Sequence, residues 1–422
     1  MNVELVNTGS ELMLGRVLNT HQQWLCRRLA DLGSRVTRQV AVPDTGGDIG
    51  AAVSEALGRA DLVITTGGLG PTSDDLTRDR IAQLLGRDLH EDAGVLAYIR
   101  AYFARRKRTM PEKVYVQALV PEGAVVLPNP NGTAPGLAIE VKPNPFRAGK
   151  AASWLIMLPG PPRELRPMFN DSVVPLLNRV LPPQSEYVCR TLRTAGTAES
   201  LVEEQIDGPL KSLVEAGLEL GYCARVGQVD VRLAARGAAA RQIVSDAEAI
   251  VRRLLDARIY GKEEDELETV VVRLLTERKL TLAVAESCTG GCLANRLTNV
   301  PGASAVFLCG LVTYSNEAKQ KLLGVRPESL AQHGAVSEAV AREMAEGVRR
   351  HSGADYALST TGIAGPSGGT VEKPVGTVFI GLAGPEGTVV EQQFNSFDRE
   401  TFKQLTVQQA LARLYLKLLQ ST

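Results

Sequence analysis

The chain has 422 residues, 44% of them hydrophobic, and it carries 47 basic and 47 acidic side chains. This length suits two or three domains of roughly 150 residues each, and the hydrophobic content is sufficient for sizeable cores. The balanced charge argues against a nucleic-acid-binding protein that works through bulk electrostatics.

The first residues show neither the basic segment nor the long apolar core of a signal peptide, and no apolar run is long enough to span a bilayer. The six cysteines are scattered through apolar segments, as reduced thiols usually are. We therefore expect a cytoplasmic protein with no membrane partner. Cys288 and Cys292 lie one helical turn apart, but no histidine or second cysteine pair is near them in sequence, which disfavours a zinc site.

Strands and helices alternate in the first part of the chain. Apolar runs at 3–6, 36–42 and 61–66 predict buried strands. Helical spacing of apolar residues follows the first strand at 24–32 and separates the other two at 49–57. This alternation predicts a doubly wound, mostly parallel sheet.

Acidic residues follow all three of these predicted strands. Glu11 follows the first strand, Asp44 the second, and the pair Asp74 and Asp75 the third. Because ligands bind at the carboxyl ends of the strands in such sheets, we expect these side chains to share one site. Carboxylates there could hold a divalent metal ion that bridges to a phosphate.

A glycine-rich turn lies between the third strand and its aspartates, and it contains Gly67, Gly68, Gly70 and Thr72. Glycines let the backbone approach a phosphate closely, and the following helix N-terminus attracts anions. The alternative is a structural turn in which the Asp and Thr side chains only cap the helix. The turn-rich loops that follow, NPNGTAPG and LPGPPRE, can bring further polar groups to the same sheet edge.

The middle of the chain reads as a small, split α+β unit. Residues 170–262 show the order strand, helix, strand, strand, helix, strand. We find no catalytic constellation there, which favours a spacer or a dimerisation module. An acidic run at 263–266 suits a domain boundary.

A strand, a tight turn and a helix organise the last part of the chain. The apolar run at 282–285 predicts a buried strand, Ser287 lies in the turn, and Thr289, Gly290 and Gly291 open a stretch with helical spacing. A serine at this place could be the N-cap of the helix. It could also be a nucleophile beside an oxyanion site, because the first amides of a helix and the helix dipole favour negative charge.

A lysine and a tyrosine follow the next predicted strand. Lys319 lies in the first turn of a short helix, where the helix dipole and partial burial would lower its pKa, as a neutral general base requires. Its alternative is an ordinary surface lysine. Tyr314 could donate or relay a proton, or it could be a packed aromatic residue with a bonded hydroxyl.

A second glycine-rich loop is predicted at the same sheet edge. Thr361 ends a strand there, and the loop that follows contains glycines whose amides could bind a phosphate or a ribose. These glycines are Gly362, Gly365 and Gly368.

The motifs TGSEL, GGLGPTSDDLT, NPNGTAPG and LPGPPRE, in this order, resemble the N-terminal domain of the CinA (competence/damage-inducible) proteins. That domain is similar in fold to the molybdopterin-binding MoaB/MogA and MoeA domains. The resemblance implies a pyrophosphatase that acts on ADP-ribose and depends on a divalent ion, either Mg, Mn, Co or Ni. By motif position it implies Asp75 as the essential aspartate, with Glu11 and Asp44 as its acidic partners. One departure is His21, in NTH where the family often has NTN.

The motifs AESCTGG, GLVTYSNEAK, HGAVSE, TTGIAGPSGG and KPVGTV resemble the nicotinamide-nucleotide amidohydrolase (PncC-type) domain that ends CinA proteins. The resemblance implies that the carboxamide of nicotinamide mononucleotide is hydrolysed to the acid, with release of ammonia and no metal, by Ser287, Lys319 and Tyr314. It also implies a homodimer. This sequence departs from the family at Phe397, where relatives often have glycine before Asp-Arg, and at Lys403, where arginine is frequent.

We therefore predict an α/β protein with a MoaB/MogA-like domain at 1–169, a small α+β linker domain at 170–262 and an amidohydrolase domain at 263–422. We expect a bifunctional enzyme of pyridine-nucleotide salvage that acts on small nucleotides and binds no nucleic acid. Two alternatives stay open. The N-terminal domain could bind a nucleotide or pterin without turnover, since a fold does not determine function. Cys288 could replace Ser287 as nucleophile, although nothing in the sequence marks it as an activated thiolate.

Overall fold

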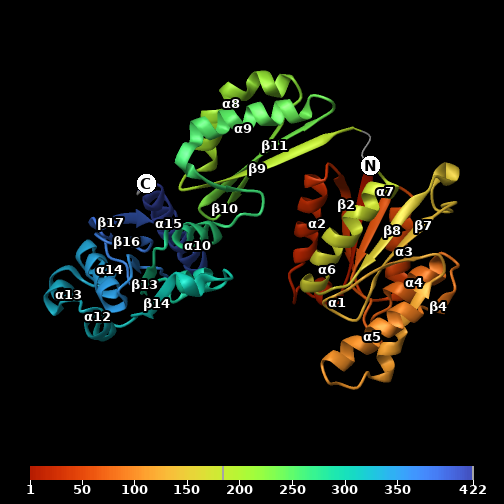
Figure 1. Cartoon of the computed structure of the whole chain (residues 1–422), viewed down its shortest axis with the longest axis horizontal. Helices are drawn as coiled ribbons and strands as arrows, with labels where there is room; N and C mark the ends of the chain where they lie inside the picture. Colours follow the sequence, from red (N-terminus) through yellow and green to blue (C-terminus); the bar gives the residue numbers. More distant parts are fainter. Residues whose placement is uncertain (183–184, 421–422) are drawn as a thin grey trace. The chain divides into compact units, whose positions relative to one another are not determined.

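The computed structural model of the chain describes residues 1–182 and 185–420. These residues form two compact units, one spanning Met1–Tyr187 and the other beginning at Val188 (Figure 1). No helix among the described residues is both long and apolar enough to cross a membrane.

The first unit is built on a six-stranded sheet with the strand order β2-β1-β3-β8-β7-β6. The first four strands are mutually parallel, and β7 and β6 complete the sheet in antiparallel fashion. This confirms the predicted doubly wound, mostly parallel architecture. The sheet strands are β1 (Asn2–Thr8), β2 (Arg35–Val42), β3 (Leu62–Thr66), β6 (Val125–Leu127), β7 (Gly136–Val141) and β8 (Ser153–Leu158), and β4 (Leu89–Glu91) pairs separately with β5 (Leu119–Pro121).

Helices cover both faces of this sheet because its central strands are apolar on both sides. On one face, Val53 and Leu57 of α3 pack into a cluster with Val63 of β3. On the other face, Leu25 and Leu29 of α2 pack into a second cluster. The helices are α1 (Ser10–Met13), α2 (Thr20–Asp31), α3 (Gly46–Leu57), α4 (Thr77–Leu84), α5 (Ala93–Arg105), α6 (Pro162–Met168) and α7 (Val174–Val180), with a 3₁₀ segment at Glu112–Ala118.

The first unit extends beyond residue 169, where the sequence suggests a boundary. Helical backbone continues from α6 through Phe169–Val173 into α7. Phe169, Val173 and Leu177 belong to the same buried cluster as α2 and the sheet. Their burial ties this segment to the first unit, which ends at Tyr187.

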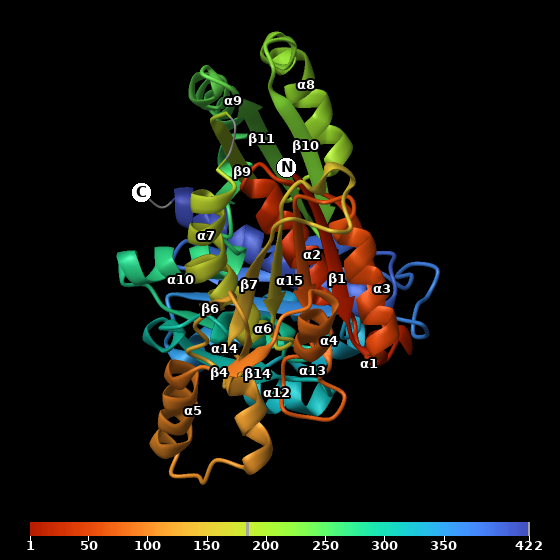
Figure 2. The same ribbon diagram turned by 90° about the vertical axis from the view of Figure 1, so that its right-hand side faces the viewer.

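The second unit begins with a small sheet of the order β10-β11-β9-β12. Helices α8 and α9 lie side by side along it (Figures 1 and 2). Apolar residues of α9, among them Val244, Ala247 and Val251, recur at helical spacing and pack against the strands. The elements are β9 (Tyr187–Ala195), α8 (Glu199–Glu215), β10 (Glu219–Arg225), β11 (Gln228–Arg236), α9 (Ala240–Leu255) and β12 (Ile259–Lys262).

The rest of the second unit is a five-stranded sheet of the order β14-β13-β15-β16-β17. Strand β13 is parallel to both of its neighbours, so the carboxyl ends of β13, β14 and β15 meet at one edge. Helix α14 packs on one face, and α10, α11 and α15 cover the other. The elements are α10 (Leu267–Arg278), β13 (Leu282–Glu286), α11 (Cys292–Thr298), β14 (Phe307–Val312), α12 (Asn316–Leu323), α13 (Pro327–His333), α14 (Glu338–Ser352), β15 (Tyr356–Gly362), β16 (Thr377–Gly384), β17 (Gly387–Phe394) and α15 (Arg399–Gln420).

The two sheets of the second unit are joined by specific polar contacts. The Tyr415 hydroxyl of α15 donates to the Ile259 carbonyl of β12 at 2.9 Å. The Arg193 side chain of β9 is only 1% exposed, and its Nε donates to the Glu263 carbonyl at 2.7 Å. These bonds join the small sheet to α15 and to the segment that precedes α10, and the two sheets belong to one compact unit.

Candidate active sites

Ser287 lies where the three parallel strands of the C-terminal sheet end. Its amide donates to the Thr360 carbonyl of β15 at 2.9 Å. On the other side, the Thr313 amide after β14 donates to the Glu286 carbonyl at 2.8 Å. The turn that carries Ser287 is therefore held by both neighbouring strands.

The interpretation of Ser287 as a helix cap is wrong, because Glu286 satisfies the free amides of α11. The buried Glu286 carboxylate accepts hydrogen bonds from the amides of Gly291, Leu293 and Ala294, at 3.0, 3.1 and 2.8 Å. The N-cap residue of α11 is Gly291, in the left-handed conformation. A carboxylate binds a helix N-terminus more strongly than a hydroxyl does, since it adds full charge to the dipole interaction. The Ser287 hydroxyl is thus free for another role.

Lys319 is the partner of that hydroxyl. Its side chain is 1% exposed, and its Nζ lies 3.1 Å from Ser287 Oγ. The carbonyls of Thr313 and Tyr314 accept from the same Nζ, at 2.9 and 3.2 Å. The structure therefore brings together two of the predicted catalytic residues, and both carbonyls come from the segment that follows β14.

These contacts suit a neutral amine. A neutral Nζ has two hydrogens for the two carbonyls, and its lone pair is left to accept the Ser287 proton. Burial lowers the pKa of Lys319 below its usual value of 10.5, because charge is costly in a site shielded from water. The surface alternative for Lys319 is excluded by its burial.

The Tyr314 side chain lies apart from this pair. It is 64% exposed, and its hydroxyl accepts from an Arg399 guanidinium nitrogen at 3.0 Å. Arg399 also donates to the Gly365 carbonyl of the second glycine loop at 2.8 Å. The phenol is therefore exposed to solvent and bonded to Arg399, while the backbone carbonyl of Tyr314 holds Lys319.

Cys288 is buried behind the turn. Burial raises the pKa of its thiol to about 12, so the thiol is protonated at neutral pH and is a poor nucleophile. Cys26, Cys288, Cys292 and Cys309 form no disulfide bond.

The predicted substrate-binding residues of this site have different surroundings. The amides of Gly290 and Gly291 are engaged within the turn, by the Ser287 carbonyl and the Glu286 carboxylate. The Thr289 hydroxyl is bonded to that of Thr360 at 2.7 Å, and the Thr361 hydroxyl donates to the Ala335 carbonyl at 2.7 Å. The predicted oxyanion site near Thr289 to Gly291 therefore cannot use the amides of Gly290 and Gly291, because both already have acceptors.

Among the predicted loop glycines, Gly365 and Gly368 have positive φ of 71° and 94°, and Gly362 ends β15. Sequence reasoning missed Glu286 and Arg399. The signal for Glu286 was a carboxylate that comes directly after the predicted strand at 282–285 and shortly before a helix.

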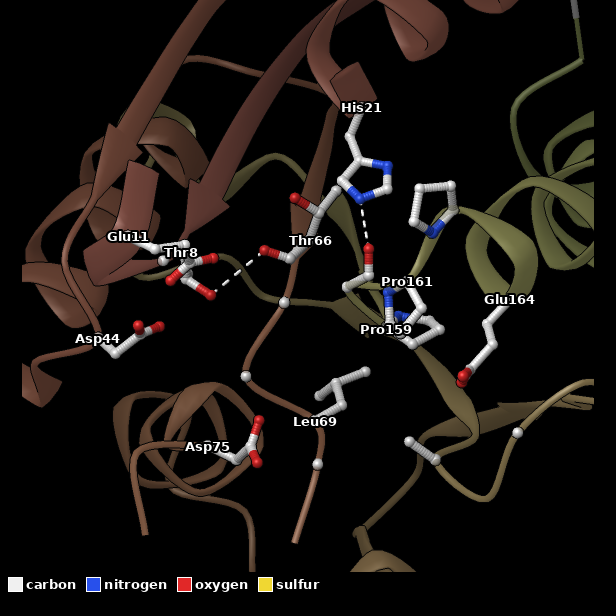
Figure 3. Close-up of a pocket in the computed structure, with 18 of the residues that line it drawn as sticks. Thr8, Glu11, His21, Asp44, Thr66, Leu69, Asp75, Pro159, Pro161 and Glu164 are labelled. Atoms are coloured by element: carbon white, nitrogen blue, oxygen red, sulfur yellow. Dashed lines mark hydrogen bonds between the residues drawn. The ribbon is translucent and has the colours of Figure 1, made fainter. Parts of the chain in front are cut away.

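The N-terminal unit contains a cavity of about 610 Å³ at the carboxyl ends of β1, β3 and β8. Its lining includes the glycine turn, the predicted acidic residues and the PGPPRE loop. In Figure 3, Glu11 and Asp44 lie on one side of the cavity and Glu164 on the opposite side, with the glycine turn between them. The structure therefore gathers the predicted residues around one cavity.

The glycine turn packs too closely for larger residues. A Cβ on Gly68 would lie 2.1 Å from Thr77 Oγ1, and Gly68 has a φ of +67°. A Cβ on Gly70 would lie 2.3 Å from Asp75 Oδ2. Gly68 is thus required for the turn itself, whereas a side chain at position 70 would displace the Asp75 carboxylate.

The carboxylates of this cavity are fixed by local hydrogen bonds. Asp75 accepts from the Thr72 amide at 2.9 Å and from its hydroxyl. Asp44 accepts from the Ser10 amide at 2.7 Å. Hydrogen bonding with Thr72 lowers the pKa of the exposed Asp74 carboxyl. Glu11 is exposed at the edge of the cavity.

Within the described residues, no three His, Cys, Asp or Glu side chains are grouped as a set that could hold a metal ion. The donor set therefore does not form an all-protein cage. It fits an ion such as Mg²⁺, which is usually held by one or two carboxylates, waters and the phosphates of a substrate. The predicted residues Asp75, Asp74, Asp44 and Glu11 all line the cavity and could supply those carboxylates.

His21 lies in the wall of this cavity. Its Nε2 is hydrogen-bonded to the Gly160 carbonyl of the PGPPRE loop (Figure 3). Burial lowers the pKa of His21, so its ring is neutral and donates through Nε2. This bond fixes α2 to the loop that carries Glu164, a residue that sequence reasoning did not single out.

Three family profiles match consecutive parts of the chain. They are described as "Probable molybdopterin binding domain" at residues 4–179, "Damage-inducible protein CinA KH domain" at 189–261 and "CinA C-terminal domain" at 264–418.

Curated relatives match over nearly the full length. The chain is 46% identical over 415 residues to a CinA-like protein from Akkermansia muciniphila, which covers 98% of this chain and 97% of that protein. It is 48% identical to a putative competence-damage inducible protein from Symbiobacterium thermophilum, over 91% of this chain and 88% of that protein.

Among solved structures, a CinA superfamily protein from Klebsiella pneumoniae is 40% identical over 36% of this chain and 96% of its own, with a TM-score of 0.36. A putative molybdenum cofactor biosynthesis protein from Corynebacterium diphtheriae is 16% identical over 43% of this chain and 99% of its own, with a TM-score of 0.29.

Proposed function

The chain belongs to the CinA family, and from this premise we propose that its C-terminal domain is a serine amidohydrolase. Its substrate is nicotinamide mononucleotide, and its products are nicotinate mononucleotide and ammonia. The observation that supports this proposal is the 3.1 Å contact between Ser287 Oγ and the buried Lys319 Nζ. A serine paired with a neutral amine is an activated nucleophile.

The reaction follows from this pair. Ser287 Oγ attacks the carboxamide carbon while its proton passes to Lys319 Nζ, which the carbonyls of Thr313 and Tyr314 hold in place. The resulting ammonium then gives a proton to the leaving nitrogen, and ammonia departs from the acyl-enzyme. Lys319, neutral again, accepts a proton from the water that attacks the acyl carbon, and it returns that proton to Ser287 Oγ as the acid leaves.

The oxyanion of the tetrahedral intermediate needs donors beside Ser287. The amides of Cys288 and Thr289 are the best candidates, because neither has a backbone acceptor among the described residues. They follow the nucleophile directly in the chain. Each such donor typically contributes about a hundredfold or more in rate.

The nucleotide part of the substrate would lie toward the glycine loop. Arg399 lies there, bonded to Tyr314 and Gly365. The Lys403 Nζ lies 3.7 Å from the position that a Cβ on Gly290 would occupy, so it is close to the nucleophile turn. These two cations suit the phosphate of a mononucleotide.

We further propose that the N-terminal cavity binds ADP-ribose and cleaves its pyrophosphate. The glycine turn lines the cavity, where its backbone would approach the phosphates, and Asp75, Asp44 and Glu11 would hold a divalent ion together with phosphate oxygens and water. Such an ion would neutralise phosphate charge. The alternative is a domain that binds a nucleotide or pterin without turnover, and it predicts binding of ADP-ribose with no AMP or ribose 5-phosphate formed.

The C-terminal proposal is tested by ammonia release from nicotinamide mononucleotide, with and without a chelator. We expect release that resists the chelator, that is lost in Ser287→Ala, and that is retained in the neighbouring control Cys288→Ala. Near-full activity in Ser287→Ala, or loss confined to Cys288→Ala, would contradict the assignment. In the same samples, hydrolysis of ADP-ribose that stops on chelation supports the N-terminal proposal.

A further inference from the structure

Glu164 is a carboxylate buried in the wall of the N-terminal cavity, opposite the acidic residues proposed for a metal ion. The residue is 8% exposed, and it lies in the first turn of α6 with its side chain lining the cavity. Figure 3 shows it across the cavity from Glu11 and Asp44. A buried carboxylate is costly unless its oxygens accept hydrogen bonds, so its partners indicate what it is for.

One oxygen of Glu164 has a fixed protein partner. Asn129 Nδ2 donates to Glu164 Oε2 at 2.8 Å and to the Ala134 carbonyl at 2.7 Å. Asn129 Oδ1 accepts from the Asn131 amide at 3.2 Å. These partners determine which end of the Asn129 amide faces Glu164, so the carboxylate is held in one orientation.

The other oxygen has no such partner. Gly132 packs against Oε2, where a Cβ would lie 2.0 Å away. Oε1 accepts no hydrogen bond among the described residues, and Nε of the exposed Arg163 is 3.9 Å away. The protein therefore covers one oxygen and leaves the second as an acceptor for a ligand.

We propose that Glu164 is the sugar-binding residue of this cavity, and that its free oxygen accepts a hydrogen bond from a ribose hydroxyl of the nucleotide. This inference rests on the nucleotide-binding function proposed above for the same cavity. A carboxylate repels phosphate oxygens, so the pyrophosphate is placed toward the glycine turn and the metal-binding side. A hydroxyl is the hydrogen-bond donor that a ribose offers.

The orientation of the bound nucleotide follows from this placement. The pyrophosphate lies over the glycine turn, and one ribose reaches the loop that carries Asn129 and the start of α6. Glu164 would thus select for the sugar and not for the charge of the ligand. The acceptor is formed before binding, because Asn129 already fixes it.

The test combines a protein change with a ligand change. Glu164→Gln can keep its amide oxygen toward Asn129, and it then presents a donor where wild type presents an acceptor. Dissociation constants are measured by calorimetry on the full chain, with initial rates in parallel. The ligands are ADP-ribose, its two forms lacking the 2-hydroxyl of one or the other ribose, and the form with hypoxanthine in place of adenine.

We expect wild type to bind one deoxy form about 10- to 150-fold more weakly than ADP-ribose, the range for a hydrogen bond to a charged group. Glu164→Gln should bind ADP-ribose and this deoxy form with the same affinity, whereas the exposed control Glu140→Gln should discriminate between them as wild type does. Glu164→Asp keeps the charge but withdraws it by one methylene, and it should retain part of the discrimination. It provides the test if the Gln variant does not fold.

If both Glu164 variants still discriminated fully between ADP-ribose and its deoxy form, the inference would be overturned while the proposed function would stand. If substituting Glu164 changed only the discrimination between ADP-ribose and its hypoxanthine form, Glu164 would bind the base, and the inference would again be overturned. No binding of ADP-ribose by wild type would instead contradict the proposed function, and the sugar assignment with it.

Discussion

The capping role of Glu286 leads to a prediction that separates structure from catalysis at the nucleophile turn. In Glu286→Gln, the amide oxygen can replace Oε2 and still accept from Gly291 and Leu293. The amide nitrogen then faces the Ala294 amide, which loses its acceptor. The change keeps the size of the side chain, so the effect reports hydrogen bonding and charge.

The magnitude follows from these three bonds. An amide that loses its partner costs about 1–2 kcal/mol, and each remaining bond loses about 1 kcal/mol when its acceptor becomes neutral. These values already include the loss of the charge–dipole interaction at the helix N-terminus. We expect the free energy for opening the start of α11 to fall by about 3 kcal/mol.

Hydrogen–deuterium exchange of the peptide that begins α11 measures this change locally. A loss of about 3 kcal/mol corresponds to roughly 150-fold faster exchange at Leu293 and Ala294. Ser287→Ala is the matched control, and its exchange there should stay within a few-fold of wild type. Wild-type exchange in Glu286→Gln, or acceleration in Ser287→Ala equal to that in Glu286→Gln, would refute the reasoning.

Three further predictions follow from the two sites. Burial lowers the pKa of Lys319, and only the neutral amine can act as a base. The value of kcat/KM for deamidation should therefore rise with pH and then level off, and the midpoint of the rise should lie below pH 10.5. Lys319→Met should lower kcat by about 10²–10⁴-fold. In Gly68→Ala the new methyl group would clash with Thr77, and alanine is strained at the positive φ of this position. Unfolding in urea should therefore show that the free energy of unfolding of the N-terminal unit falls by about 2 kcal/mol or more. The control Gly50→Ala lies inside α3 with open space around it, and it should raise this free energy by about 0.5–1 kcal/mol. Tyr314→Phe removes a bond to Arg399 and none to Ser287 or Lys319, so KM for nicotinamide mononucleotide should rise while kcat falls less than about tenfold; a loss of about a hundredfold in kcat would show that the phenol relays the proton.

Much of the fold could be predicted because the central strands are continuous apolar runs. Strand β3 is buried at every residue and β13 likewise, and such runs alternate with helical spacing along both α/β sheets. The same logic placed Ser287 and Lys319 at neighbouring strand ends. Their contact is a consequence of β13 and β14 being parallel neighbours.

The remaining features depend on contacts that no local pattern encodes. Glu286 directly follows an apolar run in the sequence, and its capping role requires the chain to turn back over its carboxylate. Asn129 and Glu164 are 35 residues apart and meet only because two loops converge at one sheet edge. The end of the first unit was also not predicted from the sequence, because the segment after Phe169 is short and its burial depends on α2.

The central claim is that Ser287, activated by a neutral Lys319, becomes covalently bound to the substrate. Rapid quenching of the full chain during turnover of nicotinamide mononucleotide, followed by peptide mass spectrometry, tests it directly. The account predicts a nicotinate mononucleotide ester on Ser287 that is absent from Ser287→Ala. An adduct on Cys288, or turnover in Ser287→Ala at the wild-type rate, would contradict it.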